Sequence, residues 1–211
     1  MHHVMFDIDG TLVKSYELDS KCFVESVKDV TGVIIDSDWS KYRHVTDSGI
    51  LNEIMERNHI DNGQEVCERV KAIFLEKLQK SIANEPVEQI SGAAEFIAQL
   101  ASMNHVVISL ATGGWYESAV LKLESAGINF SSIPLLSSSD HESRVEIMRA
   151  AVSSIKNSKD YPCTYFGDGS WDKKACDQLG FSFVLVGNKI SHRKNIKDFL
   201  SFEKVLECIG I

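Results

Sequence analysis

The stretch that decides the fold is VMFDIDGTLV, residues 4–13. Its apolar beginning, residues 4–6, predicts a short buried strand, and Asp7 follows where that strand should end. Asp9 comes two residues later and is followed by Gly-Thr. Two carboxylates this close repel each other in a dry crevice unless a divalent cation lies between them or one of them holds a proton. The alternative reading is structural, because Asp-Gly between apolar residues is also a strong hairpin signal.

Length and composition are those of an ordinary soluble globular protein. The chain has 211 residues, of which 44% are hydrophobic and 25% are charged, which suffices for one sizeable domain with or without a small insert. The net charge of −8 argues against a broad nucleic-acid surface. No apolar run is long enough to span a bilayer, and the N-terminus has no pattern of a secretory signal. We therefore expect a cytoplasmic protein, monomeric or homodimeric, that binds neither nucleic acid nor membrane.

The five cysteines are odd in number and show no C-x-x-C spacing. This pattern predicts reduced thiols packed in the protein, as in a cytosolic chain. It argues against a disulfide framework and against a zinc site.

Residues 15–87 predict a mainly helical block. Apolar residues recur at helical spacing over about 19–31 and about 64–83. Asp47 or Ser48 would cap a further helix between these two.

The rest of the chain alternates strands with helices. The expected strands are residues 106–111, 133–136, 163–166 and 181–186, and the expected helices include 144–155 and 171–179. Such alternation implies an α/β fold, a Rossmann-like parallel sheet with helices on both faces. We expect an α/β core domain of residues 1–14 and 88–211, interrupted after its first strand by a helical domain of residues 15–87.

Polar residues follow three of the expected strands. Asp7, Thr112 and Asp168 each stand where a strand ends, and ligands bind at the carboxyl ends of strands in an open parallel sheet. Thr112 and Gly113 also begin a turn into a helix, where a hydroxyl and free N–H groups can hold an anion. Taken alone, Thr112 fits a helix N-cap and the Gly-Asp-Gly around Asp168 fits a turn. Together these residues suit phosphoryl chemistry on Mg²⁺ with an aspartate as the nucleophile.

With these residues in place, the whole chain resembles the haloacid dehalogenase (HAD) superfamily, in the branch of phosphatases, phosphoglycolate phosphatase and β-phosphoglucomutase. DIDGTLV, residues 7–13, resembles the first family motif; residues 111–113 resemble the second, and GDGSWD, residues 167–172, resembles the fourth. The helical block stands where the family places its C1 cap. The third motif is a basic residue, usually Lys, for which Arg144 is the best match and Arg149, one turn later, is the second choice.

The resemblance implies roles for the motif residues. Asp7 would be the nucleophile that forms an aspartyl-phosphate, and Asp9 would be the general acid and base. Mg²⁺ would be held by Asp7, the backbone carbonyl of Asp9 and Asp168, with Asp172 behind them or reaching the ion through water. The residues that would hold the phosphoryl oxygens are Thr112, Gly113 and Arg144.

Asp9 also distinguishes branches of the family. Dehalogenases lack an acid at this position and phosphonatases carry a small residue there, so the resemblance implies a phosphatase that hydrolyses a small phosphorylated metabolite. Relatives of β-phosphoglucomutase place a His about where Asp19 stands, and its absence favours a hydrolase over a phosphomutase, which stays as the alternative. A non-enzymatic phosphoacceptor is a third possibility, against which Asp9 argues because it would promote hydrolysis of the phosphoaspartate.

Substrate identity should reside in the helical block. Arg43, Tyr16 and His44 are the candidate substrate contacts, and Arg43 could bind an anionic tail of the substrate. The alternative is that these side chains face water or pack between helices, as most polar surface residues do. The sequence does not name the substrate.

Overall fold

The sheet at the centre of the protein is parallel throughout. The computed structural model describes residues 1–61, 63–157 and 160–211, and within them six strands are hydrogen-bonded in the order β3-β2-β1-β4-β5-β6. The strands are β1 (His2–Phe6), β2 (Val106–Ala111), β3 (Leu135–Leu136), β4 (Cys163–Gly167), β5 (Ser182–Val186) and β6 (Asn195–Ile196). The strand order reverses at β1, so the chain leaves the ends of β1, β2 and β4 side by side around one crevice.

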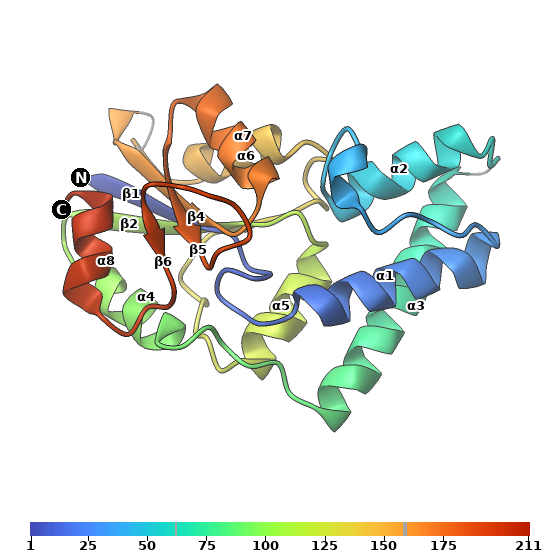
Figure 1. Ribbon diagram of the computed structural model, residues 1–211, viewed down its shortest axis with the longest axis horizontal. Helices are drawn as coiled ribbons and strands as arrows, with labels where there is room; N and C mark the ends of the chain where they lie inside the picture. The colour runs from blue at the N-terminus through green and yellow to red at the C-terminus, as the bar shows by residue number, and fades with distance from the viewer. Residues whose placement is uncertain (62, 158–159) are drawn as a thin grey trace.

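Helices make up most of the remaining structure (Figure 1). They are α1 (Tyr16–Thr31), η1 (Trp39–Lys41), α2 (Asp47–Arg57), α3 (Gly63–Asn84), α4 (Ala93–Ala101), α5 (Tyr116–Ser125), α6 (Arg144–Ser153), α7 (Ser170–Leu179) and α8 (Phe202–Ile209). In the part of the chain that the structure describes, none of them is long and apolar enough to cross a membrane.

The two faces of the sheet are buried by different helices. Val4 and Phe6 of β1 point to one face, where they share a core with α4, α5 and α8. Met5 points to the other face and shares a core with α6 and α7. This alternation follows from the two-residue repeat of a strand, and it explains why the strands read as continuous apolar runs.

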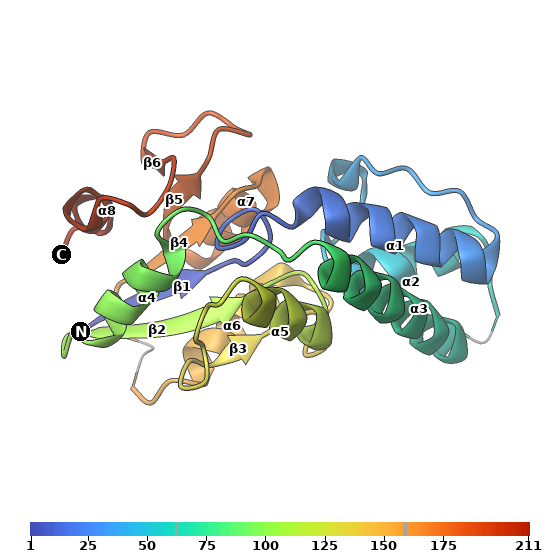
Figure 2. The same ribbon diagram turned by 90° about the horizontal axis from the view of Figure 1, so that it is seen from below.

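The helices α1, η1, α2 and α3 form a helical unit at one end of the sheet (Figures 1 and 2). The unit has its own apolar core, to which α1, α2 and α3 contribute Phe23, Leu51 and Phe74. Trp115, from the loop before α5, inserts into this core, and its ring centroid lies 5.3 Å from that of Phe74. The helical unit therefore has a small core of its own, and Trp115 connects that core to the rest of the protein.

Two connections join the helical unit to the sheet, and they run side by side. The backbone N–H of Lys14 donates to the carbonyl of Glu88 at 2.8 Å, and that of Ile90 donates to Leu12 at 2.7 Å. The predicted domain division has its boundaries in these two segments. Short paired connections of this kind are places where a small rotation can move one unit against the other.

The predicted α/β fold is confirmed, with local differences. The second helix of the helical unit is capped by Thr46, whose hydroxyl accepts from the N–H of Gly49 at 3.1 Å, and not by Asp47 or Ser48 as predicted. The strand predicted over 133–136 contains only β3, and β6 was not predicted because two residues give no readable periodicity. All five cysteines are free.

Candidate active site

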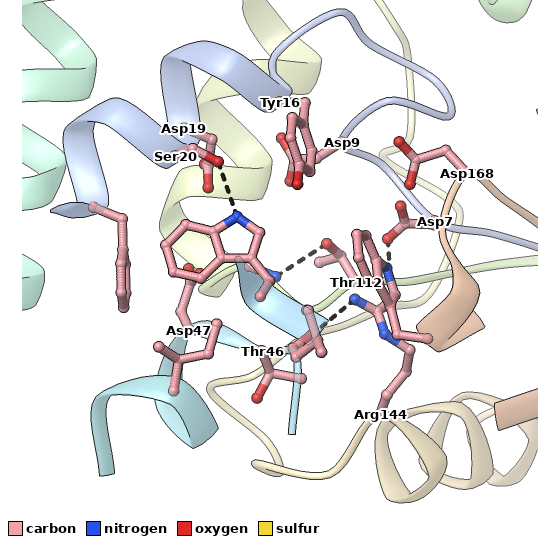
Figure 3. A pocket seen from close by; sticks show the side chains of 17 residues that line it. Asp7, Asp9, Tyr16, Asp19, Ser20, Thr46, Asp47, Thr112, Arg144 and Asp168 are labelled. Carbon is pink, nitrogen blue, oxygen red and sulfur yellow. Dashed lines mark hydrogen bonds and ion pairs between the residues drawn. The ribbon is translucent and has the colours of Figure 1, made fainter. Parts of the chain in front are cut away.

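Three polar side chains meet where neighbouring strands end. Asp7 directly follows β1, Thr112 follows β2 and Asp168 follows β4, and their exposures are only 3%, 1% and 2%. The pairing of β1 with β4 continues to the N–H of Asp7, which donates to the carbonyl of Phe166 at 2.9 Å. The register of the sheet thus brings residues 161 positions apart in the sequence to one pocket (Figure 3).

Three carboxyl groups lie close together at this edge. Oxygen atoms of Asp7, Asp168 and Asp172 lie within 4.8 Å of one another. Burial, and next the charge of Asp172, raise the pKa of the Asp7 carboxyl well above its ordinary value. The same two causes, in the same order, raise the pKa of Asp168 to about 6. This donor set of crowded carboxylate oxygens fits a hard divalent cation, which would relieve the repulsion among them.

Gly10 is required by the way the first motif folds against Asp168. Its φ of +78° lies in the left-handed region, which side chains disfavour. A Cβ atom at this position would lie 2.0 Å from Oδ2 of Asp168. Its N–H donates to the carbonyl of Val13 at 2.8 Å and closes the loop. The Asp-Gly pair therefore forms a tight loop beside the pocket, and β1 pairs with the parallel strands β2 and β4 and forms no hairpin.

Asp172 is the one carboxyl group of this cluster that does not line the pocket. It is completely buried, and its Oδ2 accepts from the N–H groups of Asp168 and Gly169 at 3.1 and 3.0 Å. Its Oδ1 forms an ion pair with Arg144 at 3.0 Å. Asp172 lies outside the pocket lining, so it acts on the pocket by fixing the backbone of Asp168 and the guanidinium of Arg144.

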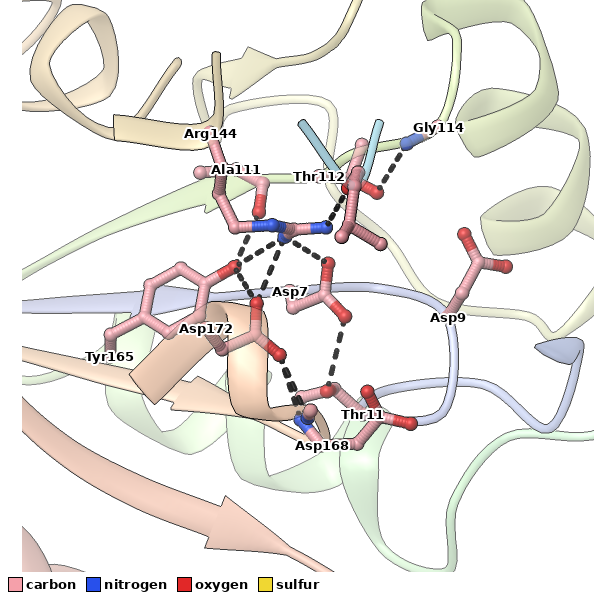
Figure 4. Close-up of polar contacts among 12 residues, drawn as sticks. Asp7, Asp9, Thr11, Ala111, Thr112, Gly114, Arg144, Tyr165, Asp168 and Asp172 are labelled. Carbon is pink, nitrogen blue, oxygen red and sulfur yellow. Dashed lines mark hydrogen bonds and ion pairs between the residues drawn. The ribbon is translucent and has the colours of Figure 1, made fainter. Parts of the chain in front are cut away.

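Arg144, the first residue of α6, forms ion pairs with both Asp7 and Asp172 (Figure 4). Its Nη1 lies 3.3 Å from Oδ1 of Asp7 and 3.3 Å from the hydroxyl of Tyr165. A Cβ atom on Gly113 would lie 2.4 Å from its Nη2, so the glycine of the second motif leaves room for the guanidinium. Arg149, the second choice of the sequence analysis, is exposed and pairs with Glu146. Arg144 thus has the position needed to hold an anion next to Asp7.

Asp9 is held by a second buried cation that the sequence analysis missed. Lys122 of α5 has no exposed side-chain surface, and its Nζ lies 2.7 Å from Asp9 and 2.6 Å from Asp19. The hydroxyl of Ser15 also donates to Asp9. Burial alone would lower the pKa of Lys122, but the carboxylates of Asp19 and Asp9 outweigh it and raise that pKa above its ordinary value. The sequence could have pointed to Lys122 only through its position, because it lies with Ala119 and Leu123 on the buried face of α5.

A third basic side chain, Lys189, was also missed. It forms an ion pair with Asp168, and its Nζ lies 3.4 Å from the ring centroid of Tyr16. Lys189 follows β5, so it belongs to the same edge of the sheet as Asp7 and Thr112. Only its place at a strand end could have pointed to it, and single lysines in such loops are common.

The pocket lies between this sheet edge and the helical unit. It holds about 560 Å³ of space between the atoms, open solvent included. Of the predicted substrate contacts, Tyr16 lines it. Arg43 and His44 line a neighbouring hollow between the helical unit, α6 and α7, and Arg43 forms ion pairs with Glu53 and Glu56.

The helical unit rests directly on the second motif. The N–H of Asp47 donates to the carbonyl of Gly113 at 2.8 Å, and the N–H of Trp115 donates to Oδ2 of Asp47 at 2.8 Å. The hydroxyl of Thr46 donates to the carbonyl of Glu142 at 2.6 Å. The pocket is therefore covered by the helical unit in this structure.

Comparison with known proteins agrees with this geometry. The family described as Haloacid dehalogenase-like hydrolase matches residues 4–186. No curated protein matches the sequence.

Solved structures resemble the chain over almost its whole length. β-Phosphoglucomutase from Clostridium difficile is 16% identical with a TM-score of 0.75, over 100% of this chain and 97% of that one. CbbY from Rhodobacter sphaeroides in complex with phosphate is 14% identical with a TM-score of 0.73, over 100% of both chains. Magnesium-bound YfnB from Bacillus subtilis is 14% identical with a TM-score of 0.59, over 100% of this chain and 99% of that one.

Proposed function

The chain belongs to the haloacid dehalogenase-like hydrolase family, and we propose that it is a Mg²⁺-dependent phosphatase of a small phosphorylated metabolite. The observation that carries the proposal is the buried cluster of Asp7, Asp168 and Asp172 with Arg144 beside Asp7. A carboxylate nucleophile, a cation site and an anion-binding guanidinium are the parts that phosphoryl transfer to an aspartate needs.

The residues of the sheet edge fit a bound Mg²⁺. Carboxylate oxygens of Asp7 and Asp168, together with the carbonyl of Asp9, would hold the ion, and Asp172 would fix Asp168 from behind. The ion would neutralise charge on the phosphoryl oxygens when it is bound. The magnesium-bound relative from Bacillus subtilis supports this assignment.

In the first step a carboxylate oxygen of Asp7 attacks phosphorus, forming an oxygen–phosphorus bond while the bond to the leaving oxygen breaks. Arg144, the hydroxyl of Thr112 and the N–H groups of the loop after it stabilise the transferring group. Asp9 gives its proton to the leaving oxygen, so that the product leaves as a neutral alcohol. The carboxyl of Asp9 faces this loop, since a Cβ on Gly114 would lie 3.5 Å from its Oδ2.

In the second step water attacks the phosphorus of the aspartyl-phosphate. Asp9 takes a proton from this water, and the bond between Asp7 and phosphorus breaks, which restores the Asp7 carboxylate and releases phosphate. Ser15 and Lys122 hold Asp9 in one place for both proton transfers.

The helical unit acts as a cap in this proposal. The helical unit covers the pocket. Its two paired connections near Lys14 and Glu88 form the hinge about which the unit would rotate to admit a substrate. A pocket covered in this way admits a small ester and excludes phosphoproteins and nucleic acid.

Metal dependence and a substrate screen test the proposal. Hydrolysis of an aryl phosphate is expected to stop in chelator and to return when Mg²⁺ is added back. Small phosphorylated metabolites are expected to react with higher kcat/KM than phosphopeptides or oligonucleotides. Full turnover in chelator would refute the metal assignment, and efficient hydrolysis of a phosphopeptide would refute the role of the cap.

A further inference from the structure

The cap end of the pocket is acidic and aromatic. Of the described residues that line the pocket, Arg144 is the only one with a cationic side chain, and it lies at the sheet edge. The side chains that the cap contributes include Tyr16, Asp19, Ser20, Phe23, Trp39 and Asp47. Figure 3 shows Asp19 and Asp47 on the side away from Asp7 and Asp168. A substrate would therefore meet Arg144 at its phosphoryl end and the carboxyl groups of Asp19 and Asp47 at its other end.

Asp47 differs from the other carboxyl groups of the pocket. Each of the others has a basic partner: Asp7 pairs with Arg144, Asp9 and Asp19 pair with Lys122, and Asp168 pairs with Lys189. Asp47 is only 8% exposed, and within the described chain no Lys, Arg or His forms an ion pair with it. The N–H of Trp115 is the one donor that the described residues supply to its carboxyl group. Burial, and next the charge of Asp19, raise the pKa of this carboxyl well above its ordinary value, and a cation bound beside it would favour its charged form.

Aromatic rings line the same pocket as Asp47. Trp39 is 7% exposed and Phe23 is 2% exposed, and their rings pack edge to face with centroids 5.9 Å apart. The indole N–H of Trp39 donates to the hydroxyl of Ser20 at 3.2 Å, which fixes the ring in the pocket wall. Aromatic faces beside a carboxylate are the usual surroundings of a bound ammonium group.

The backbone of Asp47 is hydrogen-bonded to the loop of the second motif. The N–H of Asp47 donates to the carbonyl of Gly113, the residue beside Thr112 in the loop that would hold the phosphoryl group. Asp47 therefore lies directly beside this loop, and its Oδ2 accepts from the N–H of Trp115 in the same segment.

We propose that the substrate is the phosphate ester of a short amino alcohol, whose ammonium group is bound by Asp47 against Trp39 and Phe23. This inference rests on the proposed phosphatase function and assigns its substrate class. A second phosphate or a carboxylate on the substrate would face Asp19 and Asp47 without a cation to bind it. The same reasoning disfavours a phosphomutase, which must bind two phosphoryl groups.

Three two-carbon esters that differ in their terminal group test the inference on the wild-type enzyme with Mg²⁺. Phosphoethanolamine ends in an ammonium, 2-hydroxyethyl phosphate in a hydroxyl and 2-phosphoglycolate in a carboxylate. The expected order of kcat/KM is ammonium, hydroxyl, carboxylate, with roughly 10- to 100-fold between the first and the last, the range for one charged hydrogen bond. A kcat/KM for 2-phosphoglycolate equal to or above that for phosphoethanolamine would overturn the inference.

Asp47→Asn is the matching variant, and Asp29→Asn is its control. Asp29 lies on α1 with an exposed side chain, so Asp29→Asn makes the same chemical change in the cap but outside the pocket. Asp47→Asn is expected to lower the ratio of kcat/KM for phosphoethanolamine to that for 2-hydroxyethyl phosphate by roughly tenfold, while Asp29→Asn leaves the ratio as in the wild type. An unchanged ratio in folded Asp47→Asn would overturn the role of Asp47, and if this variant does not fold, the wild-type order decides. Hydrolysis of none of the three esters, nor of an aryl phosphate, would refute the phosphatase function itself, whereas a reversed order refutes only the substrate class.

Discussion

Two buried basic side chains of this protein are each shared by two carboxylates, yet they connect different parts of the molecule. Arg144 lies between Asp7 and Asp172, with 10% of its side chain exposed. Lys122 lies between Asp9 and Asp19, with none of its side chain exposed. In both clusters two carboxyl groups surround one positive charge in a poorly solvated place.

The two clusters differ in the elements they join. The ionic partners of Arg144 come from the end of β1 and from α7, so this cluster fixes side chains around the sheet edge. Lys122 of α5 joins the loop after β1 to Asp19 of α1, which belongs to the cap. The first cluster therefore sets the geometry of the proposed reacting groups, and the second ties the cap to the sheet beside the proposed general acid.

Asp7→Asn should give the largest effect on activity, because it removes the proposed nucleophile from the first cluster and keeps the shape of the side chain. We expect kcat to fall at least about 10³-fold, as for loss of other catalytic nucleophiles. The thermal midpoint should not fall, because a buried carboxyl whose pKa is raised by burial is replaced by a neutral amide. A variant that keeps more than a tenth of the wild-type kcat would place the nucleophile elsewhere.

Arg144→Ala should break the first cluster as a structural element. It leaves Asp7 and Asp172 buried without their shared cation, so the free energy of unfolding should fall by about 3–5 kcal/mol in urea denaturation. The matched control is Arg149→Ala on the same helix, where the side chain is 57% exposed and the change should stay within about 0.5 kcal/mol. Equal effects of the two substitutions would contradict the assignment of Arg144.

Lys122→Met removes the cation of the second cluster and tests whether Lys122 and Asp19 act together. It leaves Asp9 and Asp19 facing each other without a cation, and adding Asp19→Asn removes one of these two charges. We expect the double variant to be more stable than Lys122→Met alone, and the double-mutant cycle with the single Asp19→Asn variant to give a coupling energy of about 2 kcal/mol. Lys80→Met, at a lysine whose side chain is 71% exposed, is the control for the loss of a lysine. Strict additivity of the two changes would show that Lys122 and Asp19 do not act together.

His3 is a buried basic side chain for which the described residues supply no carboxylate partner. Unlike Arg144 and Lys122, it should therefore stay neutral. Burial, and next the charge of His2, lower the pKa of His3 from 6.5 to about 4 in the folded protein. Since the unfolded chain binds the proton more tightly, stability is retained above the unfolded pKa and is lost as the pH falls toward the folded one. Between pH 7.5 and pH 5 the wild type should lose about 2 kcal/mol more than His3→Gln in urea denaturation. Equal pH dependence of the two proteins would show that His3 is charged in the fold.

The sequence was sufficient for the fold class and for the residues of the motifs. Continuous apolar strands such as 106–111 identify a sheet that is buried on both faces, and they alternate with amphipathic helices that have clear ends. Asp7, Thr112 and Asp168 were readable because each follows such a strand, and strand ends meet at one edge of any parallel sheet. Local pattern and general topology carry this information, so no tertiary detail was needed.

Only the tertiary structure decided how charges pair and what the pocket offers a substrate. Lys122 looks like one more lysine on a helix until α1 and α5 bring Asp19 and Asp9 to it. Arg43 looked suited to an anion, but the packing of the helical unit directs it to Glu56 and leaves Asp47 in the pocket without a basic partner. The physical reason is that an ion pair depends on distances of a few ångströms between elements far apart in the chain, and periodicity records only which face of an element is buried.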